Sequence, residues 1–214
     1  MKTKLAPSYD EYMATAIYEF ESLPSRYIHS SWYKELPHGG VLKKLANDSR
    51  SEKRISEYII SHYALGDVDS ASIPANLLGI ALNSPDDLKQ LVLYAGASLY
   101  CKSIQRVIKK RDVHMLKACL GDSVYAYALN RAPFLLSSDL IVKNILDLPG
   151  HLIAERVLNS GVCCLGSALS ELPSSFRQRV MFKLPVDCMP QFTSASADPR
   201  ACTRLLDKCI DEVH

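Results

Sequence analysis

Residues 84–95 read Ser-Pro-Asp-Asp-Leu-Lys-Gln-Leu-Val-Leu-Tyr-Ala, and this stretch shows the pattern that decides the fold. A capping residue beside a proline is typical of a helix start, because the serine oxygen can accept from free amides and the proline ring suits the first turn. The apolar residues that follow, at the spacing of one helix face, are Leu88, Leu91, Val92 and Ala95. The stretch therefore predicts an α-helix with one buried face.

Similar helix-start signals recur along the chain. Ser8-Tyr9-Asp10-Glu11 and Ser49-Arg50-Ser51-Glu52 place a hydroxyl three residues before a carboxylate, which is the spacing of a capping box. Ser72-Ile73-Pro74 and Asp198-Pro199 again pair a capping residue with a nearby proline. We predict an all-α protein with about nine to eleven short helices. With 214 residues, of which 48% are apolar, the chain suits a single compact domain over residues 1–214 or two tightly packed lobes.

Two segments depart from the helical pattern. Residues 24–37 are rich in aromatic side chains and are expected to form a turn-rich plug, whereas residues 185–198 lack any apolar period and are expected to form an irregular loop. Gly66 follows an apolar helix face that runs from Ile55 to Tyr63. We expect this glycine to end the helix in the left-handed conformation, which few other residues tolerate.

Small side chains are concentrated in the helix expected from about His151 to Leu172, where Gly161 and Gly166 lie among serine, cysteine and alanine. A glycine inside a helix costs up to about 1 kcal/mol relative to alanine. Close packing against another helix is the preferred explanation for the stripe. A ligand groove is the alternative, although no polar cluster accompanies it.

Charge and hydropathy argue against two classes of partner, nucleic acid and the membrane interior. The 25 basic and 23 acidic residues leave a net charge of +2, which does not favour nucleic acid as the partner. The longest uncharged apolar stretch, about residues 157–170, is too short to cross a bilayer, which needs about 20 residues. The N-terminal residues contain no apolar core of a secretory signal. We expect a soluble, intracellular protein with no direct membrane insertion.

The seven cysteines lack the spacing of a metal site or of a disulfide framework. Their number is odd, no C-x-x-C occurs, and we expect reduced thiols with a packing role at Cys101, Cys119, Cys163, Cys164, Cys188, Cys202 and Cys209.

Catalytic patterns are equally weak. The six histidines form no H-E-x-x-H and no i, i+4 pair, and the neighbouring aspartates at 67/69 and 86/87 are explained by a polar loop and a helix start. We predict no catalytic residue, no metal site and no cofactor, and we do not expect an enzyme.

Two groups of residues are candidates for partner binding. Lys102, Arg106 and Lys110 recur every four residues, which predicts a basic helical stripe opposite an apolar face of Ile104, Val107 and Ile108, and Lys109 and Arg111 add to the same run. An ordinary solvated helix face is the preferred interpretation of this run, and a partner surface is the alternative.

The second candidate group is Tyr27, His29 and Trp32 in the aromatic segment. These side chains are interpreted first as a packed plug and second as a partner anchor, because tyrosine and tryptophan also dominate interface hot spots.

The order of several stretches resembles the SctK/YscK family, the sorting-platform accessory proteins of bacterial type III secretion injectisomes. Residues 23–29, which read Leu-Pro-Ser-Arg-Tyr-Ile-His and are followed by Trp32 and Leu36-Pro37, are similar to the aromatic entry segment of that family. Residues 95–106 are similar to its central helix junction, and residues 121–133 continue in the same order. The C-terminal run from Ser160-Gly161 to Lys183-Leu184-Pro185 also agrees.

The resemblance implies a helical, non-enzymatic adaptor in the bacterial cytoplasm, at the cytoplasmic face of the inner membrane. Its implied partners are the forkhead-associated-like cytoplasmic domain of the inner-membrane ring protein (SctD-type) and the C-ring-like sorting-platform protein (SctQ-type). Association with the stator and the ATPase would be indirect. The resemblance supplies no catalytic motif.

Two rival functions remain open from the sequence. A helical DNA-binding regulator would need a recognition helix, and residues 102–111 are the candidate for it. A small helical enzyme would need ionisable groups that converge in a pocket.

Overall fold

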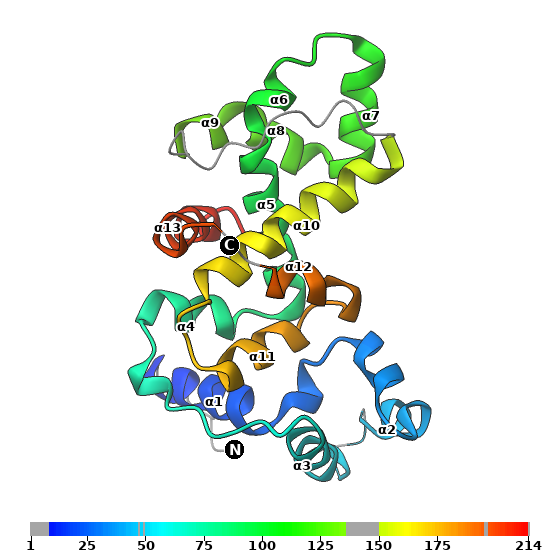
Figure 1. Ribbon diagram of the computed structural model, residues 1–214, viewed down its shortest axis with the longest axis vertical. Helices are drawn as coiled ribbons and strands as arrows, with labels where there is room; N and C mark the ends of the chain where they lie inside the picture. The colour runs from blue at the N-terminus through cyan, green and yellow to red at the C-terminus, as the bar shows by residue number, and fades with distance from the viewer. Residues whose placement is uncertain (1–8, 47, 49, 136–149, 195–196, 214) are drawn as a thin grey trace, which may run out of the picture. The chain divides into compact units, whose positions relative to one another are not determined.

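A computed structural model describes residues 9–46, 48, 50–135, 150–194 and 197–213, and all regular elements among them are helices (Figure 1). No strand occurs in these ranges, so the prediction of an all-α protein is confirmed. The described ranges contain thirteen α-helices, and ten of these have seven or more residues. None of the described helices is both long enough and apolar enough to cross a bilayer. The capping boxes predicted from Ser8 and Ser49 begin outside the described residues.

The contacts of the chain divide it into two compact units. The prediction of a single domain over residues 1–214 stays a prediction. The first unit comprises Met1–Pro85 and Pro173–Val186. Its helices are α1 (Tyr9–Ser22), η1 (Pro24–Arg26), η2 (Ser30–Glu35), α2 (Gly39–Leu45), α3 (Glu52–His62), η3 (Ser70–Ser72), α4 (Ala75–Leu82) and α11 (Ser174–Phe182).

Aromatic side chains from distant parts of the sequence meet in the core of the first unit. The ring of Trp32 lies 5.0 Å from that of Phe182 and 6.0 Å from that of Tyr63, with edge-to-face geometry in both pairs. Phe20 packs in the same manner against Phe176, at 5.3 Å. Such pairs add about 0.5–1.5 kcal/mol each beyond the burial of their area. They join α1, η2 and the end of α3 to α11, which returns to this unit late in the chain.

The second unit comprises Asp86–Leu172 and Asp187–His214. Its helices are α5 (Pro85–Leu99), α6 (Cys101–Gln105), α7 (Lys110–Leu120), α8 (Asp122–Asn130), α9 (Ala132–Leu135), α10 (Gly150–Ala168), η5 (Val186–Cys188), α12 (Met189–Thr193) and α13 (Pro199–Ile210). Leu88, Leu91 and Val92 are fully buried on α5, as the opening stretch predicts.

The small-residue stripe marks a close helix crossing within the second unit. A Cβ atom built on Gly161 would lie 1.7 Å from the carbonyl oxygen of Val92, and one built on Gly96 would lie 2.0 Å from that of Val157. The backbones of α5 and α10 therefore touch. A Cβ atom built on Gly166 would likewise lie 2.1 Å from the carbonyl oxygen of Phe192. Close packing, the preferred explanation for these small residues, is confirmed.

The prediction that Gly66 ends α3 in the left-handed conformation is wrong, because Ala64 takes that position with φ of 49°. The amide of Leu65 donates to the carbonyl of Ile60 at 2.9 Å, and the amide of Ala64 donates to that of Ser61 at 3.2 Å. These two bonds define a Schellman motif, in which the penultimate position must be left-handed. Gly66 lies beyond the motif.

The expectation of an irregular loop over residues 185–198 is also wrong for much of its length. Residues 186–193 form η5 and α12, and Phe192 is buried there. The helices are too short to show a period, because a five-residue helix makes little more than one turn. Residues 195–196 lie outside the described ranges.

Candidate partner-binding surface

The basic run does not form one helical stripe. Helix α6 ends at Gln105, and α7 begins at Lys110. The amides of Arg106 and Val107 donate three residues back, to Ser103 and Ile104, which tightens the last turn and ends the helix. The prediction of a continuous stripe through Lys102, Arg106 and Lys110 is therefore wrong.

The apolar face expected opposite this stripe is broken at the same point. Ile104 is fully buried, but the side chain of Ile108 is 90% exposed. A recognition helix over residues 102–111 is absent for the same reason, so the DNA-binding alternative loses the element on which it depends.

The cations themselves are exposed. Lys102, Arg106, Lys109 and Lys110, here called the basic cluster, all have exposed side chains. The ion pairs found among the described residues involve none of them. Arg111 is also exposed.

The start of α7 is electrostatically unfavourable. Lys109 is the N-cap residue, but its side chain makes no capping hydrogen bond, and Lys110 and Arg111 occupy the first turn. Cations near the positive end of a helix dipole destabilise the helix. Asp112 is the one acidic residue in the first turn of α7. Helix stability does not explain why basic residues stand at these positions.

The aromatic candidates lie mainly in the interior of the first unit. Trp32 is buried and donates from Nε1 to the carbonyl of Leu184 at 2.8 Å. Tyr27 is buried and donates from its hydroxyl to the carbonyl of Phe20 at 2.7 Å, and burial raises the pKa of this hydroxyl above its usual range. The preferred interpretation of these two side chains as a packed plug agrees with these contacts.

His29 is half-buried and has a local structural role. Its Nδ1 accepts from the amide of Ser31, which caps η2, and its own amide donates to the carbonyl of Phe182 at 2.7 Å. The backbone amide of His29, and not its ring, thus connects the aromatic segment to the end of α11.

Two buried cations, Arg179 in α11 and Lys183 at its C-cap, are structural features that the residue patterns did not reveal. The guanidinium of Arg179, which is 3% exposed, donates from Nε and Nη2 to the carbonyl of Glu21 and from Nη1 to those of Gly66 and Ser175. Burial lowers the pKa of Arg179, but arginine remains charged. The guanidinium thus joins α1 and the segment after α3 to α11.

Lys183 has the same relationship to α4. Its Nζ donates to the carbonyls of Ala81 and Asn83 at 2.5 and 2.6 Å, at the negative end of the helix dipole. The ammonium also lies over the rings of Phe20 and Tyr27, at 5.3 and 5.2 Å. Burial lowers its pKa to about 8. A signal for both cations existed in their spacing, three and seven residues after the buried Phe176, which places them on the apolar face of α11.

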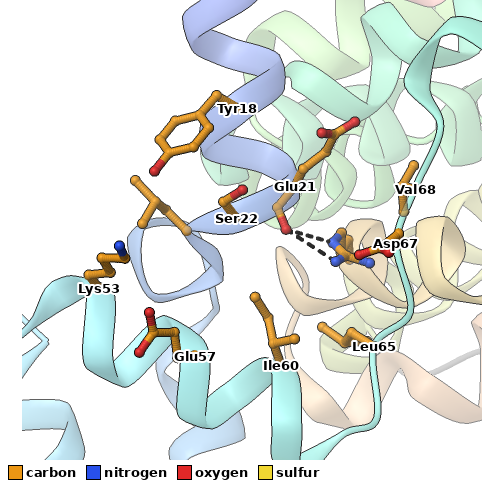
Figure 2. A pocket seen from close by; sticks show the side chains of 11 residues that line it. Tyr18, Glu21, Ser22, Lys53, Glu57, Ile60, Leu65, Asp67 and Val68 are labelled. Carbon is orange, nitrogen blue, oxygen red and sulfur yellow. Dashed lines mark hydrogen bonds between the residues drawn. The ribbon is translucent and has the colours of Figure 1, made fainter.

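A pocket of about 450 Å³ within the first unit has Arg179 among its lining residues. Figure 2 shows Tyr18 and Glu21 reaching it from α1, Glu57 from α3, and Asp67 from the segment after α3, with dashed lines for the two bonds to the Glu21 carbonyl. The carboxylate of Glu21 also accepts from the hydroxyl of Ser70. Among the residues that the structure describes, no group of three His, Cys, Asp or Glu side chains could hold a metal ion.

Comparisons with known proteins identify the family. A family model described as "YOP proteins translocation protein K (YscK)" matches residues 14–212. The nodulation protein NolU of Rhizobium fredii and that of Sinorhizobium fredii (strain NBRC 101917 / NGR234) are each 25% identical to this chain over 100 residues. That match covers 47% of this chain and 44% of each relative, so it spans less than half of the relatives' length. No solved structure matches the chain. Because the family model covers nearly all of its length, the chain belongs to the YscK family of type III secretion proteins.

Proposed function

We propose that this protein is a non-enzymatic adaptor of a bacterial type III secretion injectisome. It would link the forkhead-associated-like cytoplasmic domain of the inner-membrane ring protein to the C-ring-like sorting-platform protein, in the cytoplasm at the inner-membrane face. The observation that carries this proposal is the match of the YscK family model to residues 14–212.

The basic cluster favours a partner whose contact surface is acidic. Its four cations are exposed, and the ion pairs found among the described residues leave them out. Exposed charges of one sign accelerate encounter with a surface of the opposite sign and orient it. We therefore assign partner contact to the basic cluster and a packing role to Tyr27 and Trp32.

The test is binding of the purified chain to the purified ring-protein domain and to the purified C-ring-like protein, in low and in moderate salt. The variant that carries both Lys102→Glu and Arg106→Glu should weaken binding to one of these partners, and the binding lost should depend on salt. A matched control is the variant that carries both Lys43→Glu and Lys44→Glu, which changes the charge equally on exposed residues of α2. If the Lys102→Glu, Arg106→Glu variant binds each partner as well as the Lys43→Glu, Lys44→Glu control does, the basic cluster is ordinary solvated surface.

A further inference from the structure

The geometry points to Ile108 as the apolar anchor of a protein-docking site, which inserts into an apolar pocket with an acidic rim on the partner. This inference rests on the adaptor function proposed above and deepens it, because it names the contact and the chemistry of the surface that receives it.

The exposure of Ile108 is the first observation. Its side chain is 90% exposed, the largest exposed fraction among the large apolar side chains of the described residues. Ile104, four residues earlier, is fully buried. The chain turns Ile108 outward because α6 ends before it and α7 begins after it.

The second observation is that the backbone on both sides of Ile108 is held in place. The amide of Val107 donates to the carbonyl of Ile104 at 3.1 Å, and the carbonyl of Lys109 accepts from the amides of Asp112 and Val113 at 2.9 and 3.0 Å. A contact presented by hydrogen-bonded backbone loses less conformational entropy on binding than one presented by a free loop.

The third observation is the charge around this position. In the chain, Arg106 precedes Ile108, and Lys109, Lys110 and Arg111 follow it, all with exposed side chains. Those at the start of α7 stand where they disfavour the helix. Charges that oppose local stability are expected where binding requires them.

The combination favours a protein over a lipid surface as the occupant. An exposed aliphatic side chain with exposed cations close to it in the chain fits the centre of a small protein interface, where the surrounding contacts exclude water from the anchor. Interfacial membrane helices bury an extended apolar face instead. The four cations near Ile108, which are Arg106, Lys109, Lys110 and Arg111, require acidic groups on the rim of the partner's pocket.

The anchor is tested with the purified ring-protein domain and the purified C-ring-like protein as separate probes. We expect Ile108→Ala to weaken binding to one probe about tenfold or more, chiefly through faster dissociation, without changing the salt dependence. Phe134→Ala, which removes another highly exposed apolar side chain of the second unit, is the matched control and should bind like the wild type.

The charges are tested with a variant that carries both Lys109→Ser and Lys110→Gln. Serine is a good N-cap residue, and loss of the cations relieves the helix dipole, so the melting temperature should stay unchanged or rise. Association should nevertheless slow and become less sensitive to salt. Lys43→Gln with Lys44→Gln is the control of equal charge change.

The outcomes separate this inference from the proposed function. If the wild type binds a probe and Ile108→Ala binds it equally well, the anchor is wrong and the adaptor function stands. If the wild type binds neither probe, both are wrong. If the wild type instead binds vesicles of phosphatidylglycerol and phosphatidylcholine, and Ile108→Ala abolishes that binding alone, the site is a lipid contact and the protein pocket is wrong.

Discussion

Gly96 and Gly161 face each other where α5 meets α10, and neither position has room for a methyl group. A Cβ atom built on Gly161 would lie 1.7 Å from the carbonyl oxygen of Val92 and 3.1 Å from the amide nitrogen of Gly96. The atoms in the way belong to backbone, which cannot move aside as a side chain can. The contact therefore fixes the distance between two helices that form the centre of the second unit.

We predict that Gly161→Ala lowers the free energy of unfolding by about 1–3 kcal/mol through overpacking, although alanine favours helix. Gly79→Ala is the control, since a Cβ built on that helical glycine meets no atom within 4 Å apart from its chain neighbours and its own helix backbone. That variant should be as stable as the wild type or more so. Chemical denaturation measures both, and equal stability of the two variants would show that the helices do not touch at Gly161.

At the Schellman motif that ends α3, we predict a substitution that raises the free energy of unfolding. Ala64 holds φ of 49°, which glycine adopts without steric strain. Ala64→Gly should therefore raise the free energy of unfolding by up to about 1 kcal/mol. The control is Ala118→Gly on the exposed face of α7, where the same substitution should cost about 1 kcal/mol. A loss of stability at both sites would mean that residue 64 is not left-handed.

Lys183 should make stability depend on pH in a defined window. Burial lowers its pKa to about 8 in the folded protein, from 10.5 for a free lysine. Between these values the unfolded chain binds the proton and the folded chain does not, so this residue makes stability rise with pH, by up to about 3 kcal/mol. Below pH 8 both states are protonated, and the contribution is flat.

The measurement is the difference in unfolding free energy between the wild type and Lys183→Met from pH 7 to pH 10.5. The difference isolates this residue from the thiols and phenols that titrate in the same range. It should shift in favour of the wild type as the pH rises above 8. Parallel curves would show that the Lys183 ammonium is not desolvated.

The cysteines should react in two groups. All seven lie in the described part of the chain, where none of them forms a disulfide: Cys119 and Cys163 are half-buried, and Cys101, Cys164, Cys188, Cys202 and Cys209 are buried. Burial also raises the pKa of the Cys101 and Cys209 thiols, which lowers their thiolate fraction. A thiol reagent followed by peptide mass analysis should label Cys119 and Cys163 first, and all seven after unfolding without reductant. Early labelling of Cys209 would contradict the packing of α13.

Sequence patterns predicted the features that depend on neighbours along the chain. The spacing of Leu88, Leu91 and Val92 was sufficient to predict the buried face of α5, and the density of small residues was sufficient to predict the close approach at Gly161. Both signals repeat within one helix, so a single segment contains them.

Features that depend on distant partners could not be predicted in this way. Arg179 can be buried because the carbonyls of Glu21 and Gly66, more than a hundred residues earlier in the chain, accept hydrogen bonds from its guanidinium. Ile108 continues the apolar period of Ile104, yet it is 90% exposed, and the period alone predicted a helix that continues past the end of α6. The basic cluster is visible in the sequence as a charge run, but the break between α6 and α7, which separates Lys102 from Lys110, is visible only in the structure.

The adaptor function is tested most directly by a bridging measurement. The ring-protein domain and the C-ring-like protein are mixed with and without this chain, and their complexes are sized by analytical ultracentrifugation. We predict a three-component complex that forms only when the chain is present. Association of the two other proteins without it, or binding of the chain to only one of them in every mixture, would contradict a linking role.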